Sequence, residues 1–187
     1  MDPKMKILST PLSGLNIVET NGYFDKRGAF QRFYCDKTLI SLIGKREIVQ
    51  INHSLTVEVG TIRGMHFQNH PHAEMKLIRC IRGRVWDVAV DIRKNSYTFL
   101  KWYAEELTPL NSRMMVIPEG FAHGFQVLEP NSELLYFHTA RYEPESEGGI
   151  RFDDPLLGIR WPLNAVNLAI RDKRHSLIQP LFEGVEF

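Results

Sequence analysis

The stretch KLIRCIRGRVWDVAVDIR, residues 76–93, decides the fold, because the character of its side chains alternates with a period of two. In its second half the even positions from Trp86 to Ile92 are apolar, whereas the odd positions include Asp87 and Asp91. Successive side chains of a β-strand point to opposite faces, so the alternation predicts strands. The glycine between the two halves predicts a tight hairpin turn that would pair them.

The same alternation recurs elsewhere in the chain. The segment ELLYFHTARY (133–142) places Tyr136 and His138 on one face. Segments of this kind are separated by clusters of proline, glycine and asparagine, as at 109–112 and 118–120. Many short strands between turn signals predict an all-β sandwich or jelly-roll barrel with a few short helices.

One segment has helical spacing instead. DKTLISLIG (36–44) offers Asp36 as an N-cap, apolar residues on one helical face and Gly44 as a stop. The length of 187 residues suits one domain with a real core, so we expect 1–187 to form a single jelly-roll domain. The pattern loosens after about residue 162, and this last segment is expected to pack across the barrel.

Charge and cysteine content narrow the classes of function. The formal net charge is +1, so bulk electrostatics indicate neither nucleic acid nor an anionic membrane as a partner. Cys35 and Cys80 form no CxxC pair, which favours a reduced cytoplasmic protein over the alternative of one disulfide. No apolar run is long enough to span a bilayer, and the start MDPKMKILS lacks the apolar segment of a signal peptide.

A pair of histidine-containing motifs raises the question of a metal. Residues 64–83 resemble the first cupin motif, in which two histidines and a glutamate bind a metal. His70 and His72 fit that motif, but Lys76 stands where the glutamate should be, and IPEGFAHGF resembles the second motif and supplies His123. A lysine ammonium repels a cation and offers it no lone pair, so we expect no metal. The alternative is a metal-dependent cupin oxygenase or isomerase that uses the three histidines.

A more specific resemblance covers nearly the whole chain. It is carried by IRGMHFQ (62–68), KLIRCIRGRVWDVAVDIRKNSYTF (76–99), IPEGFAHGF (117–125), EGGIRFDDPLLGIRWP (147–162) and the pair Arg171-Asp172. In these motifs the chain resembles the dTDP-4-dehydrorhamnose 3,5-epimerase family of the cupin superfamily. The resemblance implies a jelly-roll homodimer without metal or organic cofactor. It also implies an isomerase that inverts carbon 3, carbon 5 or both of a nucleotide-diphosphate-linked 4-keto-6-deoxy hexose, through an enolate, in the biosynthesis of rhamnose-like deoxysugars.

The resemblance implies a role for each of four catalytic residues. His66 is the general base, Asp172 orients it, Lys76 lies beside the sugar ketone and Tyr136 is the proton donor. The chemistry agrees with these roles. A C–H group next to a ketone is a weak acid, and a base of near-neutral pKa removes its proton efficiently. A donor aimed at the enolate oxygen stabilises the charge that develops, and inversion needs an acid on the opposite face.

The resemblance also implies the substrate-binding residues. Tyr142 is expected to stack on the nucleobase, with dTDP as the default nucleotide. Arg27, in the strand-like segment 16–34, is expected to cross to the partner subunit and bind the diphosphate, because an arginine fork binds phosphate oxygens in a bidentate manner. The other expected contacts are Gln50, Asn52, Arg63, His123, Glu147 and Arg171.

The chain departs from the family pattern near the expected site. Arg32 stands where a glutamate is usual, and Phe137-His138 follow the tyrosine where a lysine is often next. These departures leave open the nucleobase, the sugar and whether one or both carbons are inverted. A non-catalytic nucleotide-sugar-binding cupin is a further alternative, but binding alone would not need the set of base, acid and enolate-holding residues.

Overall fold

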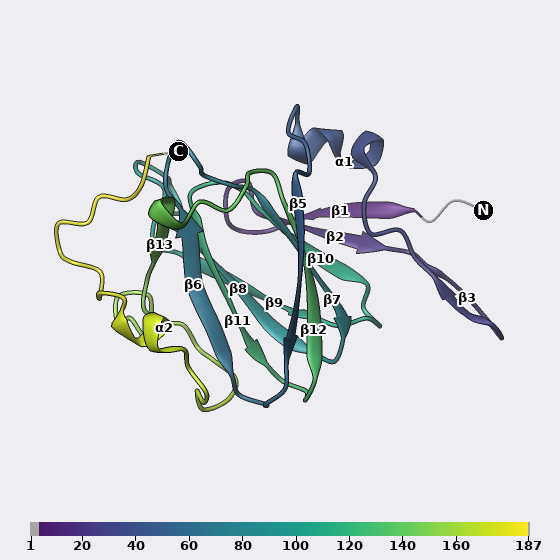
Figure 1. Ribbon diagram of the computed structural model, residues 1–187. Helices are drawn as coiled ribbons and strands as arrows, with labels where there is room; N and C mark the ends of the chain where they lie inside the picture. Colours follow the sequence, from purple (N-terminus) through teal and green to yellow (C-terminus); the bar gives the residue numbers. More distant parts are fainter. Residues whose placement is uncertain (1–3, 187) are drawn as a thin grey trace.

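Two antiparallel β-sheets face each other in the computed structural model of the chain, which describes residues 4–186 (Figure 1). The six-stranded sheet has the order β1 (Met5–Ser9), β2 (Asn16–Thr20), β10 (Arg113–Ile117), β7 (Lys76–Arg82), β12 (Ser132–His138) and β5 (Gln50–Thr56). The five-stranded sheet has the order β13 (Glu147–Gly149), β6 (Ile62–Gln68), β11 (Phe121–Val127), β8 (Val85–Asp91) and β9 (Trp102–Leu107). The predicted all-β jelly roll is confirmed.

The predicted hairpin between β7 and β8 is wrong. β7 pairs with β10 and β12 in one sheet, whereas β8 pairs with β11 and β9 in the other. The turn at Gly83, with a φ of 73°, therefore carries the chain from one sheet to the facing sheet. Alternation gives each strand two distinct faces, but it does not specify which strand lies beside it.

The predicted two faces of residues 84–93 are confirmed, and the structure shows that they belong to two separate cores. Odd-numbered Val85 and Ala89 lie between the sheets, in a core that includes Ile78, Phe125 and Leu134 from other strands. The even-numbered side chains point to the outer face of the five-stranded sheet. There they pack against residues 150–185, called the C-terminal segment from here on. This segment supplies Ile150, Leu157, Ile159, Trp161, Ile178, Phe182 and Val185.

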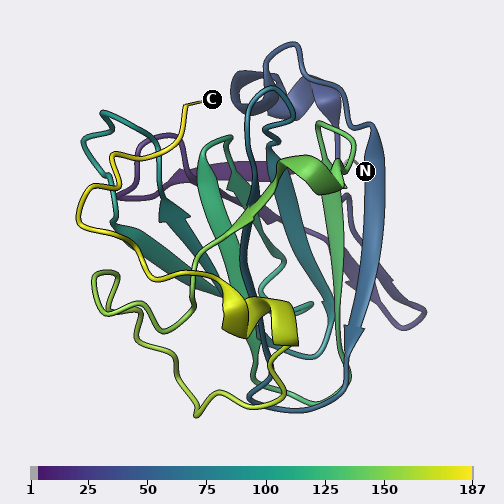
Figure 2. The ribbon, with the colours of Figure 1, turned by 60° about the vertical axis from the view of Figure 1, so that its left-hand side comes forward.

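The C-terminal segment thus covers the outer face of the five-stranded sheet (Figure 1, Figure 2). It contains the short helix α2 (Ile170–Arg174), which contacts β6. A 3-10 turn, Pro144–Ser146, leads into β13. Both faces of this sheet are therefore buried, which lets polar residues be held in place beneath the covering segment.

The helix predicted at residues 36–44 covers the outer face of the other sheet. It is α1 (Asp36–Ile43), and its buried Leu39 and Ile43 pack in a core with Leu77 and Phe137. Gly44 ends the helix as predicted. The predicted N-cap is wrong: Cys35 occupies that position without a side-chain capping bond, and Asp36 is the first helical residue.

A two-stranded arm stands apart from both sheets. β3 (Tyr23–Asp25) and β4 (Gly28–Phe30) pair only with each other, and the arm projects from the body of the molecule (Figure 1). Phe24 and Phe30 on this arm are each 64% exposed. Arg27 lies in its turn.

β6 and β11 approach each other closely at Gly64. A Cβ atom added there would lie 2.5 Å from the Cα of Gly124 and 2.8 Å from the carbonyl oxygen of His123. The φ of Gly64 is 130°, which side chains rarely allow. This close approach sets His66 opposite His123 in the strand register.

The close approach predicts that Gly64→Ala destabilises the fold. We expect a loss of about 3 kcal/mol or more in the free energy of unfolding, from overpacking added to backbone strain. Urea denaturation measures it. Gly28→Ala is the matched control, because Gly28 has a φ of 128° but no atom of the chain within 4 Å of an added Cβ. Equal losses in the two variants would show that the approach of β6 to β11 does not matter.

Candidate active site

A cavity of about 350 Å³ opens between the two sheets. Its wall brings together most of the residues predicted to form the site: Asn52, Arg63, His66, Lys76, His123, Tyr136, Tyr142, Glu147, Arg171 and Asp172. Gln50 stands just behind the wall and donates a hydrogen bond to the Asn52 side chain at 3.2 Å. Arg27 lies outside it, in the turn of the arm, 84% exposed at its side chain and paired with Asp25 at 2.6 Å.

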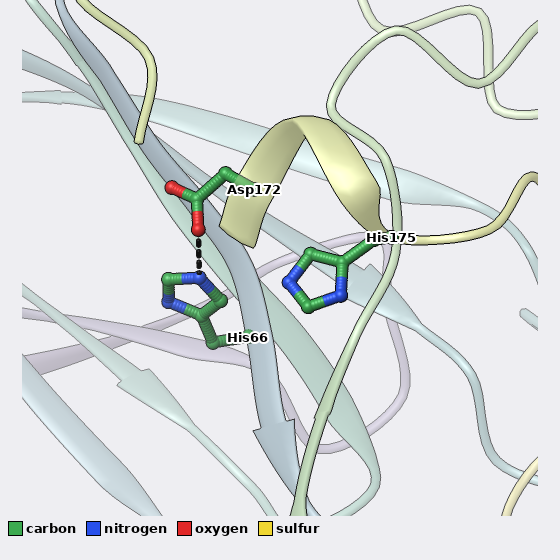
Figure 3. Close-up of side chains that lie close together, drawn as sticks. All are labelled: His66, Asp172 and His175. Atoms are coloured by element: carbon green, nitrogen blue, oxygen red, sulfur yellow. Dashed lines mark hydrogen bonds and ion pairs between the residues drawn. The ribbon is translucent and has the colours of Figure 1, made fainter. Parts of the chain in front are cut away.

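The centre of one wall is a hydrogen-bonded pair from two distant segments. His66 lies on β6, and its Nε2 is 2.8 Å from Oδ1 of Asp172 on α2. The other carboxylate oxygen of Asp172 accepts the backbone N–H of Gly64 at 3.2 Å. The Asp172 side chain is 2% exposed, whereas His66 is 21% exposed toward the cavity. Figure 3 shows the carboxylate directed at the imidazole ring.

The surroundings of Asp172 keep it ionised. Burial alone would raise its pKa, but the hydrogen bonds that it accepts from His66 and from the N–H of Gly64 outweigh burial, so the pKa lies below its ordinary value. An ionised carboxylate only accepts hydrogen bonds, so Nε2 of His66 carries a proton. Nδ1 of the neutral ring then keeps its lone pair and can act as a base.

His175 is a neighbour of this pair that the sequence interpretation missed. Its ring meets the His66 ring edge-on, with centroids 5.8 Å apart (Figure 3). Its Nε2 is buried and has no hydrogen-bond partner among residues 4–186, and burial lowers the pKa of the ring. His175 lies directly after α2, with extended backbone angles, so no helical spacing in the sequence points to its position.

The histidines of the alternative metal site are not brought together. Within residues 4–186, the one group of side chains with metal-binding geometry is His66, Asp172 and His175, whose ligand atoms lie within 4.8 Å of one another. A metal there would have to displace the hydrogen bond between His66 and Asp172. His123 is instead held by Asp87, with Nε2 2.8 Å from Oδ1.

Tyr136 occupies the opposite wall, on β12 of the facing sheet. Its hydroxyl lies 3.2 Å from the hydroxyl of Ser54, and its ring meets the edge of His123 at a centroid distance of 6.2 Å. Burial raises the pKa of Tyr136, so the phenol keeps its proton. Tyr136 and His138 share one face of the strand, as predicted, with rings stacked 6.1 Å apart.

The cavity wall also carries Tyr142, predicted to stack on the nucleobase, and three residues predicted as substrate contacts, Arg63, Glu147 and Arg171. The Tyr142 hydroxyl donates to Glu147 at 3.0 Å, and the same carboxylate accepts from Arg171 at 3.0 Å. Arg63 donates from Nε to the Thr56 hydroxyl at 3.0 Å. These bonds hold two guanidinium groups and a half-exposed tyrosine ring around the opening.

Comparisons with known proteins identify the family of the chain. The sequence model of the dTDP-4-dehydrorhamnose 3,5-epimerase family matches residues 9–179. The chain belongs to this family. A dTDP-4-dehydrorhamnose 3,5-epimerase of Salmonella typhimurium is 42% identical, over 93% of this chain and 96% of that protein. The resemblance predicted from sequence motifs is confirmed.

Solved structures of the 3,5-epimerase family have the same fold. The dTDP-6-deoxy-D-glucose-3,5-epimerase RmlC of Legionella pneumophila, in complex with dTDP-4-keto-L-rhamnose, superposes with a TM-score of 0.89 at 40% identity, covering 93% of each chain. The dTDP-4-dehydrorhamnose 3,5-epimerase of Bacillus anthracis, with TDP and PPi bound, gives 0.90 at 36% identity, covering 94% of this chain and 100% of that one.

As a member of the 3,5-epimerase family, the protein is an isomerase, as predicted. Among its described residues, no helix has the length and apolar character needed to cross a membrane. The cytoplasmic location stays a prediction.

The lowered pKa of Asp172 predicts how its removal affects stability. A carboxyl with a lower pKa in the folded chain stabilises the fold above its ordinary value of 3.8, and this contribution is lost as the pH falls through the folded value. In urea denaturation we expect Asp172→Asn to lose about 1.5–3 kcal/mol near neutral pH. The difference from wild type should shrink as the pH falls from about 5 to about 3.

A carboxylate on the surface provides the control. Asp153 pairs with Arg151 at 2.6 Å with both side chains partly exposed, so Asp153→Asn should cost less than about 1 kcal/mol. A deficit in Asp172→Asn that does not change with pH would contradict the charge-based account.

Proposed function

We propose that the protein inverts both carbon 3 and carbon 5 of a dTDP-linked 4-keto-6-deoxy hexose, in deoxysugar biosynthesis of the rhamnose type. Membership of the family supports this substrate class, as does the ligand in the similar Legionella structure. Inversion at carbon 3 or carbon 5 alone is the alternative outcome within the same chemistry.

The observation that carries the proposal is the position of the base relative to the acid. His66 belongs to the five-stranded sheet and Tyr136 to the six-stranded sheet, and both line the cavity between them. A planar enolate bound in this cavity would present one face to each sheet. Removal of a proton on one face and delivery on the other inverts the carbon, which is why the two groups belong on different walls.

The first step transfers a proton from the carbon next to the ketone to Nδ1 of His66. The electron pair of the broken C–H bond forms a double bond to the carbonyl carbon of the sugar, and the ketone oxygen gains the negative charge. Asp172 stabilises the imidazolium that forms, which together with general base catalysis is worth about 10²–10⁴-fold in rate. The Lys76 ammonium, in the cavity wall, stabilises the enolate oxygen, a contribution of about 10²–10³-fold.

In the second step the Tyr136 hydroxyl gives its proton to the same carbon from the opposite face. The charge returns from oxygen to reform the ketone, and the phenolate regains a proton from solvent while His66 loses one. The raised pKa of Tyr136 keeps the proton in place until the enolate, a strong base, is present. The same cycle can then act on the second carbon beside the ketone.

Four polar residues of the cavity wall suit the binding of the nucleotide part of the substrate: Tyr142, Glu147, Arg63 and Arg171. Tyr142 is about half exposed at the mouth, where its ring can stack on a base. Arg63 and Arg171 offer guanidinium groups to a diphosphate. These residues would hold the nucleotide outside while the sugar reaches the inner walls.

Deuterium exchange tests base and acid together. In deuterated water with a dTDP-4-keto-6-deoxy hexose, His66→Asn should lower incorporation at both carbons by about 10²–10⁴-fold. Tyr136→Phe should lower product formation more than exchange, because the enolate can still form and take back a deuteron from His66 once the ring has exchanged its proton with the solvent. NMR locates the deuterium and quantifies the product.

His72→Asn is the control, since His72 lies in the loop before β7 and outside the cavity wall. Undiminished exchange in His66→Asn would contradict its role as the base. Binding of the nucleotide sugar by wild type without any exchange would favour the non-catalytic alternative. Dependence of activity on both His72 and a divalent ion would favour the metal-dependent alternative.

The proposal extends to a homodimer in which each arm completes the partner's site. The exposed Phe24 and Phe30 give the arm an apolar surface, which a second copy could cover. Arg27 on the arm is remote from its own chain's cavity, although the resemblance assigns it to the diphosphate. In a two-fold pair, each arm could reach the other subunit by the same contact.

Mixing two inactive variants tests the shared site. In a hybrid of Arg27→Ala and His66→Ala, one site has both an intact His66 and an intact Arg27 from the partner, while the other site has both defects. With random exchange at equal amounts, activity should return to about a quarter of wild type. His66→Ala mixed with itself is the control. Complete exchange, shown by mass spectrometry, without recovered activity would contradict the shared site.

A further inference from the structure

Glu74 is a buried carboxylate in the cavity wall that neither the sequence interpretation nor the proposed reaction uses. It lies two residues before the start of β7, and its side chain is 7% exposed. Its two oxygens have different partners: Oε1 lies 3.1 Å from Nζ of Lys76, and Oε2 lies 2.7 Å from Nδ1 of His138. A buried charge is stable only when it is paired and hydrogen-bonded, and both conditions hold here.

Glu74 is ionised in this setting. Burial would raise its pKa, but the hydrogen bond from His138 and the charge of Lys76 outweigh burial, and the pKa lies below its ordinary value. The carboxylate therefore only accepts hydrogen bonds. It follows that Nδ1 of His138 is the donor in this contact.

The hydrogen bond from His138 to Glu74 is the last of a series of hydrogen bonds whose donors all point the same way. With Nδ1 donating to Glu74, Nε2 of neutral His138 accepts from the Asn52 amide at 3.3 Å. Oδ1 of Asn52 accepts from Gln50 at 3.2 Å, and Oε1 of Gln50 accepts the backbone N–H of Tyr142 at 3.2 Å. Every donor from Tyr142 to His138 points toward Glu74, where the chain ends.

The strand register explains why these residues meet. His138 lies between Lys76 on β7 and Gln50 on β5, and Tyr136 lies opposite Asn52. The chain of bonds therefore crosses three adjacent strands on the cavity side of the sheet. Phe137 faces the opposite way, into the core under α1. Phe137 and His138 are the two residues after Tyr136 that depart from the family pattern. Of these two, only His138 lines the cavity.

The Glu74 oxygen that does not contact His138 is paired with the ammonium of Lys76. The ammonium has three protons, of which one goes to Glu74 and another to the carbonyl oxygen of His66 at 3.4 Å. One N–H remains for a ligand, and its direction is set by the other two. A donor fixed before the reaction needs no reorganisation when charge develops on the substrate.

We propose that Glu74 is a positioning residue that directs the free N–H of Lys76 at the enolate oxygen, held in place by the His138–Asn52–Gln50 chain from the mouth of the cavity. This inference rests on the proposed function of Lys76. The chain also joins the backbone of Tyr142, at the nucleotide end, to the ammonium at the sugar end. Glu74 acts through Lys76 and does not itself touch the substrate.

A double-mutant cycle tests whether Glu74 acts through Lys76. Glu74→Gln keeps the shape and removes the charge, and should lower kcat by about 10–100-fold with KM changed by less than about 3-fold, because the lost interaction acts mainly in the transition state. In a Lys76→Met background the same change should alter kcat by less than about 3-fold, since the group that it positions is gone. His138→Phe, which keeps a ring beside Tyr136, should lower kcat in the same direction.

Glu119→Gln is the matched control. Glu119 is ion-paired with Arg46 outside the cavity, and its loss should leave kcat unchanged. An equal fold-loss from Glu74→Gln with and without Lys76 would overturn the proposal, as would wild-type kcat in Glu74→Gln. If wild type shows no epimerisation while nucleotide binding persists, the proposed function fails instead.

Crystal structures of wild type and Glu74→Gln test the placement without turnover. We expect the ammonium of Lys76 to lose its single position beside the His66 carbonyl in the variant. An unchanged Lys76 position at full occupancy would overturn the role of Glu74, whatever the activity. Circular dichroism melting of both proteins separates this local change from a general loss of folding.

Discussion

The hydrogen bond between Asp172 and His66 is the interaction on which the site depends. It joins a helix near the end of the chain to a strand in its first half, and it exists only because the C-terminal segment covers the outer face of the five-stranded sheet. The same carboxylate accepts the N–H of Gly64, where β6 approaches β11 most closely. The contact with Asp172 therefore sets which ring nitrogen of His66 carries the proton.

The two-sheet architecture supplies the second requirement of an epimerase. Inversion needs a base and an acid on opposite faces of a flat intermediate, and rigid sheets can hold them apart. β6 and β12 belong to different sheets, so His66 and Tyr136 face a common cavity from its two sides. A single sheet would have placed both groups on the same face of the substrate.

The interior of the cavity wall is polar although the barrel around it is apolar, and each buried charge there has a partner. Asp172 is paired with His66, Asp87 with His123, and Glu74 with Lys76 and His138. Such pairs add little net stability compared with apolar residues, but removal of one member leaves a buried charge uncompensated. Their value lies in holding donors and acceptors at fixed positions, which is what a reaction through an enolate requires.

The sequence by itself determined the all-β class, the two faces of its clearest strands, and the family. The alternation of 84–93 predicted both faces of β8, the spacing in 36–44 predicted α1, and local motifs led to His66, Lys76, Tyr136 and Asp172, which all line one cavity. These signals are local: each depends on residues within one segment or on a motif of a few positions.

Only the tertiary structure decided which segments lie side by side. The expected pairing of β7 with β8 was wrong because the period of two specifies faces and not neighbours. The alternation of 133–142 predicted the face on which His138 lies, but its contact with Glu74 and the contact of His175 with His66 join residues far apart in the sequence, to which no local pattern points. The position of Arg27 on a projecting arm was likewise decided by the tertiary structure, in which β3 and β4 pair with each other and with neither large sheet.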